Sequence, residues 1–167
     1  MTWTLANNSD RENIIALMED LDDTINPPFS SFPNGIAGSV DLTYQFGRIF
    51  ISESDDQIVG VSGYLKGMPK FKDGILTAEP ESIAYVYYTV IRPAYRGKLM
   101  YDLLPVVGNQ VILDGMDSIK FKAHKHEKIL NRFYRQLSEK SEEKINSQDV
   151  PCLQYTASAQ TWAKRIN

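Results

Sequence analysis

The chain has 167 residues, of which 43% are hydrophobic and 23% are charged, as is typical of one globular domain with its own apolar core. Lys and Arg total 18 against 21 Asp and Glu, so the formal net charge of -3 argues against a non-specific nucleic-acid binder. The single cysteine, Cys152, excludes an intrachain disulfide, and two histidines exclude a zinc-finger pattern. His124 and His126 lack a nearby third ligand, so we expect no metal site.

Hydropathy and the N-terminal segment bear on the localisation of the chain. No apolar run approaches the roughly 20 residues that a membrane span needs. The N-terminus has no basic region followed by an apolar stretch, so a secretory signal is not expected. We therefore expect a cytoplasmic protein with no membrane partner, folded as a single domain over residues 1–167. A homodimer is compatible with the sequence.

The first half of the chain alternates helical and strand patterns. Ser9, followed by Glu12, resembles a capping box and predicts a helix start. Asp55-Asp56 lies between two apolar runs and predicts a hairpin turn. In chain order, the expected elements are a strand at Thr2–Ala6, a helix from Ser9 to about Asp23, a loop at Asn26–Pro33, a weaker helix within Gly35–Tyr44, and strands at Arg48–Ser54 and Gln57–Lys66.

The second half contains the most strongly predicted strand. Ser82–Ile91 is apolar or aromatic on both alternating faces, which predicts a central strand covered on both sides. The element order predicts a mixed α/β domain. The helix expected within Lys98–Leu113 either bends at Pro105 or starts late enough that Pro105 lies in its first turn. The other expected elements are a loop at Gly67–Pro80, a turn at Arg92–Gly97, a strand at Ser118–Ala123, a helix at Glu127–Lys140, a strand at Leu153–Thr156 and a helix at Ala159–Ile166.

The segment Tyr87–Tyr101 carries the clearest sign of chemistry. A central strand there runs into a tight turn and then a helix, and a helix N-terminus with free backbone N–H groups can bind a phosphate. Arg92, Arg96 and Lys98 add three cations. The pattern alone is equally compatible with a basic turn that caps a sheet.

This segment resembles the GNAT superfamily of acyl-CoA-dependent N-acyltransferases, whose members typically carry V-x-P-x-Y-R-G-x-G-x-G/A after the fourth strand. The chain reads Ile91-Arg92-Pro93-Ala94-Tyr95-Arg96-Gly97-Lys98-Leu99-Met100-Tyr101. The family's second motif, N-x-x-A-x-x-F-Y, matches Phe133-Tyr134, with His126 taken at the Asn position. The resemblance implies an α+β fold with a mixed, mostly antiparallel central sheet and helices on both faces.

The resemblance also implies roles for particular residues. Tyr134 matches the family's general acid, and Glu81, with Glu79 nearby, is our candidate for the general base. The co-substrate would be acetyl-CoA and the acceptor a primary amine that attacks directly. The expected cofactor-binding residues are Thr89, Val90, Ile91, Arg96, Gly97, Lys98, Leu99, Met100, Tyr101 and His126.

Two loops and the net charge bear on the choice of acceptor. We expect the loops at Asn26–Gly38 and Gly67–Pro80 to select it, and the acidic net charge mildly favours a cationic or amine-bearing compound. The tyrosines Tyr85, Tyr87 and Tyr88 either line an acceptor pocket or pack in the core. The basic stretch Lys120–Lys128 either meets a phosphate or an acidic partner, or is the exposed edge of a strand.

Leu99 and Tyr101 stand where the family carries small residues, which let the backbone approach a pyrophosphate closely. Their size leaves open a second function, a GNAT-like binding or regulatory module without catalysis. Tyr101 pointing into the cleft would favour that module, and Tyr101 pointing away would favour catalysis. The missing G-x-S-x-G and G-x-x-x-x-G-K-[ST] patterns disfavour a hydrolase or a P-loop nucleotide-binding protein.

Overall fold

The computed structural model describes residues 1–146 and 149–166, and over these residues seven strands form one sheet in the order β1-β2-β3-β4-β5-β7-β6. Neighbouring strands are antiparallel except β4 and β5, which are parallel. The mixed, mostly antiparallel sheet expected from the sequence is confirmed. The strands are β1 (Trp3–Leu5), β2 (Gly47–Ser54), β3 (Gln57–Lys72), β4 (Ile75–Ile91), β5 (Ser118–His124), β6 (Lys140–Ile145) and β7 (Pro151–Ser158).

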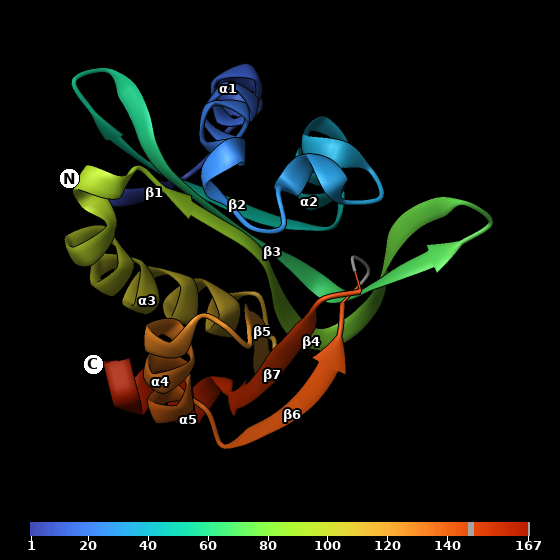
Figure 1. The fold of residues 1–167 in the computed structure, drawn as a ribbon. Helices are drawn as coiled ribbons and strands as arrows, with labels where there is room; N and C mark the ends of the chain where they lie inside the picture. Colours follow the sequence, from blue (N-terminus) through green and yellow to red (C-terminus); the bar gives the residue numbers. More distant parts are fainter. Residues whose placement is uncertain (147–148, 167) are drawn as a thin grey trace.

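Helices cover both faces of the sheet, as Figure 1 shows. Helices α1 and α2 pack on one face of the N-terminal strands around buried Met18, Val40 and Val61. On the other face, the core of α3, α4 and α5 is built around Phe121 and Trp162. In residues 1–146 and 149–166, no helix has the length and apolar character to cross a membrane. The helices are α1 (Arg11–Leu21), α2 (Gly35–Phe46), α3 (Arg96–Leu113), α4 (Lys128–Leu137) and α5 (Ala159–Ile166).

The first helix starts differently from the prediction. A 3-10 turn precedes α1, and its cap is Asn7, whose side chain accepts a hydrogen bond from the Ser9 N–H at 2.8 Å. Asp10 closes the capping box by accepting from the Asn7 N–H at 2.7 Å. The predicted pairing of Ser9 with Glu12 is therefore wrong, because Glu12 contacts the Arg11 guanidinium instead.

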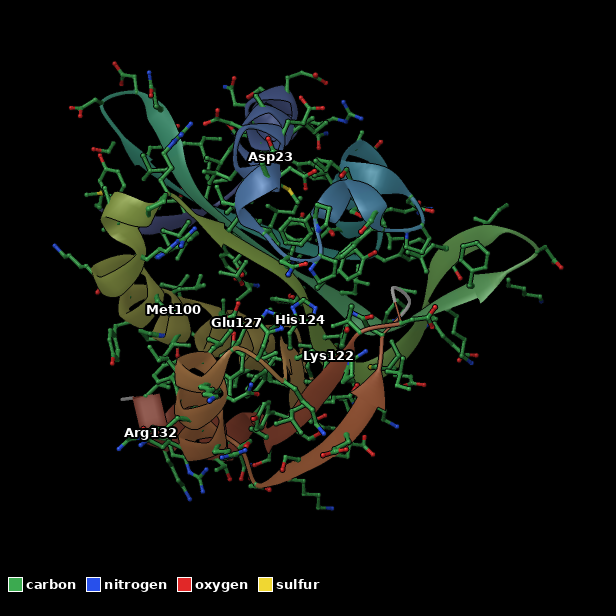
Figure 2. All side chains as sticks on the ribbon, viewed as in Figure 1. Asp23, Met100, Lys122, His124, Glu127 and Arg132 are labelled. Carbon is green, nitrogen blue, oxygen red and sulfur yellow. The ribbon has the colours of Figure 1, made fainter. Side chains whose placement is uncertain are left out.

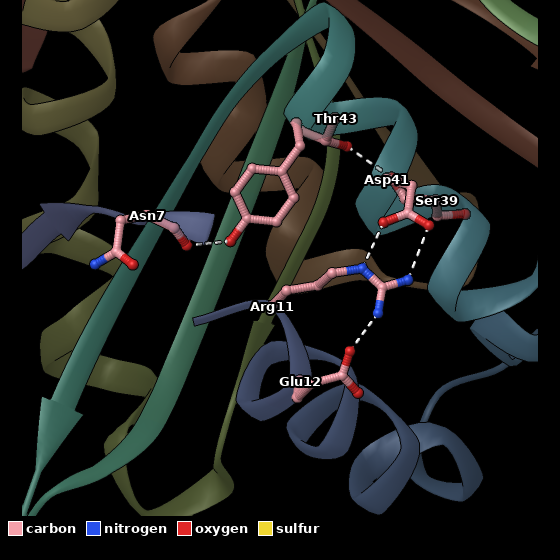
Figure 3. A network of polar contacts seen from close by, with 7 residues as sticks. Asn7, Arg11, Glu12, Ser39, Asp41 and Thr43 are labelled. Carbon is pink, nitrogen blue, oxygen red and sulfur yellow. Dashed lines mark hydrogen bonds and ion pairs between the residues drawn. The ribbon is translucent and has the colours of Figure 1, made fainter. Parts of the chain in front are cut away.

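A polar network joins α1 to α2 (Figure 3). The Arg11 guanidinium donates to both oxygens of Asp41, at 2.7 and 2.9 Å. The Tyr44 hydroxyl donates to the Asn7 carbonyl at 2.8 Å. These contacts hold the two helices side by side on their face of the sheet.

The predicted loop at Gly67–Pro80 is wrong, because β3 and β4 continue through it as a long hairpin arm (Figure 1). Asp73 and Gly74 form its two-residue turn with φ of 52° and 76°, the left-handed geometry that favours an Asp-Gly pair. Gly67 has φ of 125°, and a Cβ there would lie 1.7 Å from the Glu79 carbonyl oxygen. Glycine thus permits the close approach of the strands where the arm leaves the sheet.

Strand β6 was not predicted. All its residues are exposed, and it pairs with β7 at the edge of the sheet. Its residues show no apolar alternation, because no face of the strand is buried. The predicted helix at Glu127–Lys140 accordingly ends earlier, at Leu137.

Helix α3 begins at Arg96 and contains Pro105 in its interior, which rules out the later start that the sequence left open. Proline removes one backbone hydrogen bond, the one to the carbonyl four residues earlier. That carbonyl belongs to Tyr101, which is an exposed residue.

Asp114, just after α3, lies at the centre of a charged network. Its side chain is only 6% exposed and pairs with Arg48 at 3.0 Å and Lys66 at 3.3 Å. The Tyr64 hydroxyl donates to the same carboxylate at 2.6 Å. Burial alone would raise the pKa of Asp114, but hydrogen bonds from Arg48, Tyr64 and Gln110 lower it to about 2.

We expect Asp114→Asn to lower the free energy of unfolding by about 2 kcal/mol at pH 7, because the folded carboxyl has a pKa below its unfolded value of about 3.9. That stability is complete above pH ~4 and disappears as the pH falls toward ~2. Urea unfolding of wild type and variant at pH 7 and pH 3 measures it. The exposed Asp117→Asn is the control, and equal effects of the two substitutions would contradict the expectation.

Candidate active site

Strands β4 and β5 diverge in the middle of the sheet. Their backbone pairing begins at Ile83–Ser118 and ends at Tyr85–Lys120, although β4 continues to Ile91. The remaining part of β4 therefore presents its backbone N–H and C=O groups to the opening between the two strands. An exposed strand edge of this kind offers main-chain hydrogen bonds to an extended ligand that contains amides.

A β-bulge lies at the start of this opening. Tyr64 of β3 pairs with Val86, and its neighbour Gly63 pairs with Tyr88, so Tyr87 is the extra residue on β4. A bulge bends the strand and leaves backbone groups unpaired, and bulges are frequent beside active sites. Together, the bulge and the divergence of β5 expose the β4 backbone from Val86 onward.

Two adjoining cavities fill the opening. The larger, of about 770 Å³, is lined by β4, the loop before α2, the hairpin arm and the end of β5. The smaller, of about 420 Å³, lies at the start of α3. Since they share lining residues, they form one continuous cleft. The shared residues are Thr89, Ile91, Arg96, Met100, Glu127 and Leu130.

The start of α3 has the open geometry of an anion site. A Cβ built on Gly97 would have no atom within 4 Å, so the backbone there is accessible to a ligand. Arg96 lines both cavities, and its guanidinium donates through Nε to the Ile91 carbonyl at 3.1 Å. Lys98 is exposed on the first turn. Backbone N–H groups and Arg96 thus meet at one end of the cleft, and the exposed Lys98 adds a second cation to the same helical turn.

The two large residues of the turn occupy different places. Leu99 is fully buried, and its carbonyl accepts a hydrogen bond from the Trp3 indole at 2.9 Å. Its side chain therefore lies in the core and not beside Gly97. Tyr101 is 66% exposed and lines the smaller cavity, with its ring edge-on to Phe133 at 5.6 Å. Tyr101 thus faces the cleft, the orientation that favours a non-catalytic module, while the space at Gly97 stays open.

The structure brings most of the expected cofactor-binding residues together. Both cavities are lined by Thr89, Ile91, Arg96 and Met100. The larger cavity is also lined by Val90, and the smaller also by Gly97 and Tyr101. Neither cavity is lined by the other three expected residues, Lys98, Leu99 and His126. Of the two expected catalytic residues, Tyr134 lines the larger cavity. Glu81 is exposed on β4 and is not among the described residues that line either cavity.

Glu127 is a cleft residue that the sequence analysis missed. In N-x-x-A-x-x-F-Y the first residue precedes the Phe by six positions, so Phe133 aligns Glu127, and not His126, with the Asn. Glu127 lines both cavities. His126 contacts it from outside the cleft, with Nε2 3.6 Å from the carboxylate. The signal was available in the spacing of the motif.

His124, at the end of β5, is the second missed residue. It lines the larger cavity, its Nε2 lies 3.3 Å from Asn146 Nδ2, and its ring stacks on His126 at 5.4 Å. Burial and the neighbouring His126 lower the pKa of His124, so the imidazole is neutral at pH 7. The predicted strand, Ser118–Ala123, stopped one residue short of it.

Tyr134 is anchored in the core beneath the cleft. Its ring lies edge-on to Phe121 at 4.5 Å and to Tyr155 at 5.7 Å. Burial raises the pKa of Tyr134, so the phenol keeps its proton throughout the neutral range. Figure 2 shows Met100, Glu127, His124 and Lys122 in a row that crosses the molecule from α3 to β5.

Comparison with known structures identifies this architecture, although no protein-family model and no curated protein matches the sequence. A GNAT-family acetyltransferase from Staphylococcus aureus superposes with a TM-score of 0.69 at 15% identity, covering 95% of this chain and 98% of the other. The chain has the GNAT fold. At this identity the likeness establishes the GNAT fold and not the substrate.

Two further structures with the GNAT fold act on different acceptors according to their names. The ribosomal-protein-S18-alanine N-acetyltransferase from Escherichia coli has a TM-score of 0.66 at 9% identity and covers 95% of this chain and 93% of its own. A spermidine N-acetyltransferase chimera from Vibrio cholerae has a TM-score of 0.63 at 12% identity, with coverages of 97% and 99%. The fold therefore does not specify the acceptor, which depends on the residues of each cleft.

Proposed function

We propose that this chain is an N-acyltransferase that moves an acetyl group from acetyl-CoA to a primary amine by direct attack. The observation that carries the proposal is the continuous cleft, which joins an exposed β4 edge to an open helix N-terminus with two cations. A ligand with an amide-containing arm and a pyrophosphate has the two chemistries that these ends recognise.

The residues present fit acetyl-CoA. The backbone of Thr89–Ile91 would bind its pantetheine arm, and the α3 N-terminus with Arg96, Gly97 and Lys98 would hold its pyrophosphate. The side chain of Leu99 does not obstruct this end, because it lies in the core. The open space at Gly97 is what a close approach of phosphate oxygens requires.

Acetyl-CoA supplies an acetyl thioester, whose C–S bond breaks as the amine nitrogen forms the new C–N bond. His124, neutral at pH 7, accepts the proton that the amine loses. Tyr134 lines the same cavity and keeps its phenol protonated, and we assign it the role of hydrogen-bonding to the departing sulfur and protonating it. Cys152 also lines the larger cavity, but burial raises the pKa of its thiol, which disfavours the thiolate that an acyl-enzyme would need.

The orientation of Tyr101 favours the alternative, a module that binds through the same cleft without catalysis. The two functions differ in turnover. A catalyst releases the free thiol of CoA when an amine is added, and a thiol reagent detects it. Binding of acetyl-CoA without any release of CoA by a broad panel of primary amines would favour the module.

We expect Tyr134→Phe to lower kcat by about 10²-fold while the affinity for acetyl-CoA stays unchanged, because the variant loses only the proton donor. Thiol release with the best amine of the panel measures kcat. Tyr44→Phe is the matched control, since Tyr44 bonds to Asn7 outside the cleft. Full kcat in Tyr134→Phe would remove Tyr134 from the mechanism.

A further inference from the structure

The charge of the larger cavity differs in sign from the charge of the whole chain. Among the described residues that line it, Glu127 is the one carboxylate, whereas Arg96 and Lys122 are both cationic. The expectation that an acidic net charge favours a cationic acceptor therefore does not extend to the cleft. Because Arg96 is assigned to the pyrophosphate, a polyamine with several positive charges would meet the Lys122 ammonium and a single carboxylate, that of Glu127.

An aromatic wall lines part of this cavity. The ring of Phe32 lies 5.0 Å from Phe29 and 5.7 Å from Tyr87. The Tyr87 ring lies in turn 6.3 Å from Tyr85, and Phe71 of the hairpin arm lines the same cavity. Such a wall binds an aromatic or branched apolar group of a ligand.

Lys122 sits at this wall without a carboxylate. Its Nζ lies 5.4 Å from the centre of the Tyr85 ring, and its side chain is half-buried. In residues 1–146 and 149–166 none of the ion pairs includes Lys122. A partly desolvated ammonium of this kind gains a charge-assisted hydrogen bond when a ligand brings an anion.

Lys122 and His124 lie on the same strand and line the same cavity. They are two residues apart on β5, so they share a face and their Cα atoms are roughly 7 Å apart. An amine at His124 and an anion at Lys122 would therefore belong to the same short segment of the acceptor. An α-amino acid carries these two groups on one carbon.

We infer that the acceptor is a small monoamine that carries a carboxylate and an aromatic or branched apolar side chain. Free apolar amino acids are the class of compound with these groups. Lys122 binds the carboxylate, and the wall of Phe29, Phe32 and Tyr87 binds the apolar side chain of the acceptor. This inference rests on the proposed acetyl transfer and narrows its acceptor.

The test compares L-phenylalanine, phenethylamine and spermidine as acceptors for the purified chain, with CoA release as the readout. We expect kcat/KM for phenylalanine to exceed that for phenethylamine, which lacks the carboxylate, by about tenfold or more, and spermidine to be poorest. Lys122→Met should remove the preference by lowering kcat/KM for phenylalanine about tenfold while leaving phenethylamine unchanged. Lys120→Met is the matched control, because Lys120 lies on the same face of β5 outside both cavities.

Three results would overturn the inference: spermidine or phenethylamine turned over as well as phenylalanine, an undiminished preference in Lys122→Met, or no acetylation of phenylalanine. Titration of the same preparation with acetyl-CoA separates this failure from failure of the proposed function. If acetyl-CoA binds and other amines are acetylated, only the inference about the acceptor fails. If acetyl-CoA does not bind, the proposed function fails and the inference fails with it.

Discussion

His124→Gln should lower kcat by about 10²- to 10³-fold, the loss expected when a general base is removed. Glutamine keeps a polar side chain of similar length but cannot take up a proton near neutral pH. His126→Gln is the matched control, because His126 stacks on His124 and lines neither cavity. We expect the control to retain kcat within about twofold.

The pH dependence of kcat is a second test of whether His124 is the general base. Burial and His126 lower the pKa of His124, so its basic form is present at pH 7 and is lost as the pH falls below the ordinary histidine value of about 6.5. Wild-type kcat should therefore fall on the acid side of that value. His124→Gln should lack this acid limb, since the group that titrates has been removed.

Glu81 remains the competing prediction for the base. It is exposed on β4, and a water molecule would have to carry the proton to it. If Glu81→Gln abolishes turnover while His124→Gln retains it, Glu81 is the base and His124 is not. Equal retention of kcat by both variants would leave neither residue as the base.

Gly97→Asp should raise the Kd for acetyl-CoA by about 10²-fold or more. The substitution puts a negative charge at the helix N-terminus that we propose for the pyrophosphate, and two charges about 5 Å apart repel by about 3 kcal/mol at an effective dielectric constant of 20. A side chain fits, because a Cβ at Gly97 meets no atom within 4 Å. An acidic residue in the first turn also favours the helix, so the fold should not be weakened.

Gly97→Asn is the matched control, since asparagine has almost the same shape without the charge. We expect its Kd to stay within a few fold of wild type, and the difference between Asp and Asn to shrink as salt is added. Thermal unfolding of both variants checks the fold. Equal affinities of Gly97→Asp and wild type would show that no pyrophosphate binds beside Gly97.

The sequence was sufficient to predict the elements that are buried on both sides. Ser82–Ile91 is apolar or aromatic at both sets of alternating positions, and it forms part of β4, the central strand of the sheet. The strand, turn and helix of Tyr87–Tyr101 were also predicted, and they form one end of the cleft. In both cases the local pattern and the tertiary packing require the same conformation.

The sequence failed where pairing of the backbone, and not burial of side chains, defines the element. Strand β6 is exposed on both faces, so only its hydrogen bonds to β7 identify it. The hairpin arm carries Pro69 and Gly67, which suggested a loop, although its Asp73-Gly74 turn is a hairpin signal. His124 was missed because its position in the cleft depends on where β5 diverges from β4.

Calorimetric titration of the wild-type protein with acetyl-CoA, with CoA as the comparison, is the most direct test of the central claim. We expect one binding event of micromolar Kd, about -8 kcal/mol, for acetyl-CoA. The cleft between β4 and β5 would then be a cofactor site that retains its function despite Tyr101. No heat of binding up to millimolar acetyl-CoA would contradict the claim, because the open α3 N-terminus and the exposed β4 edge would then bind some other ligand.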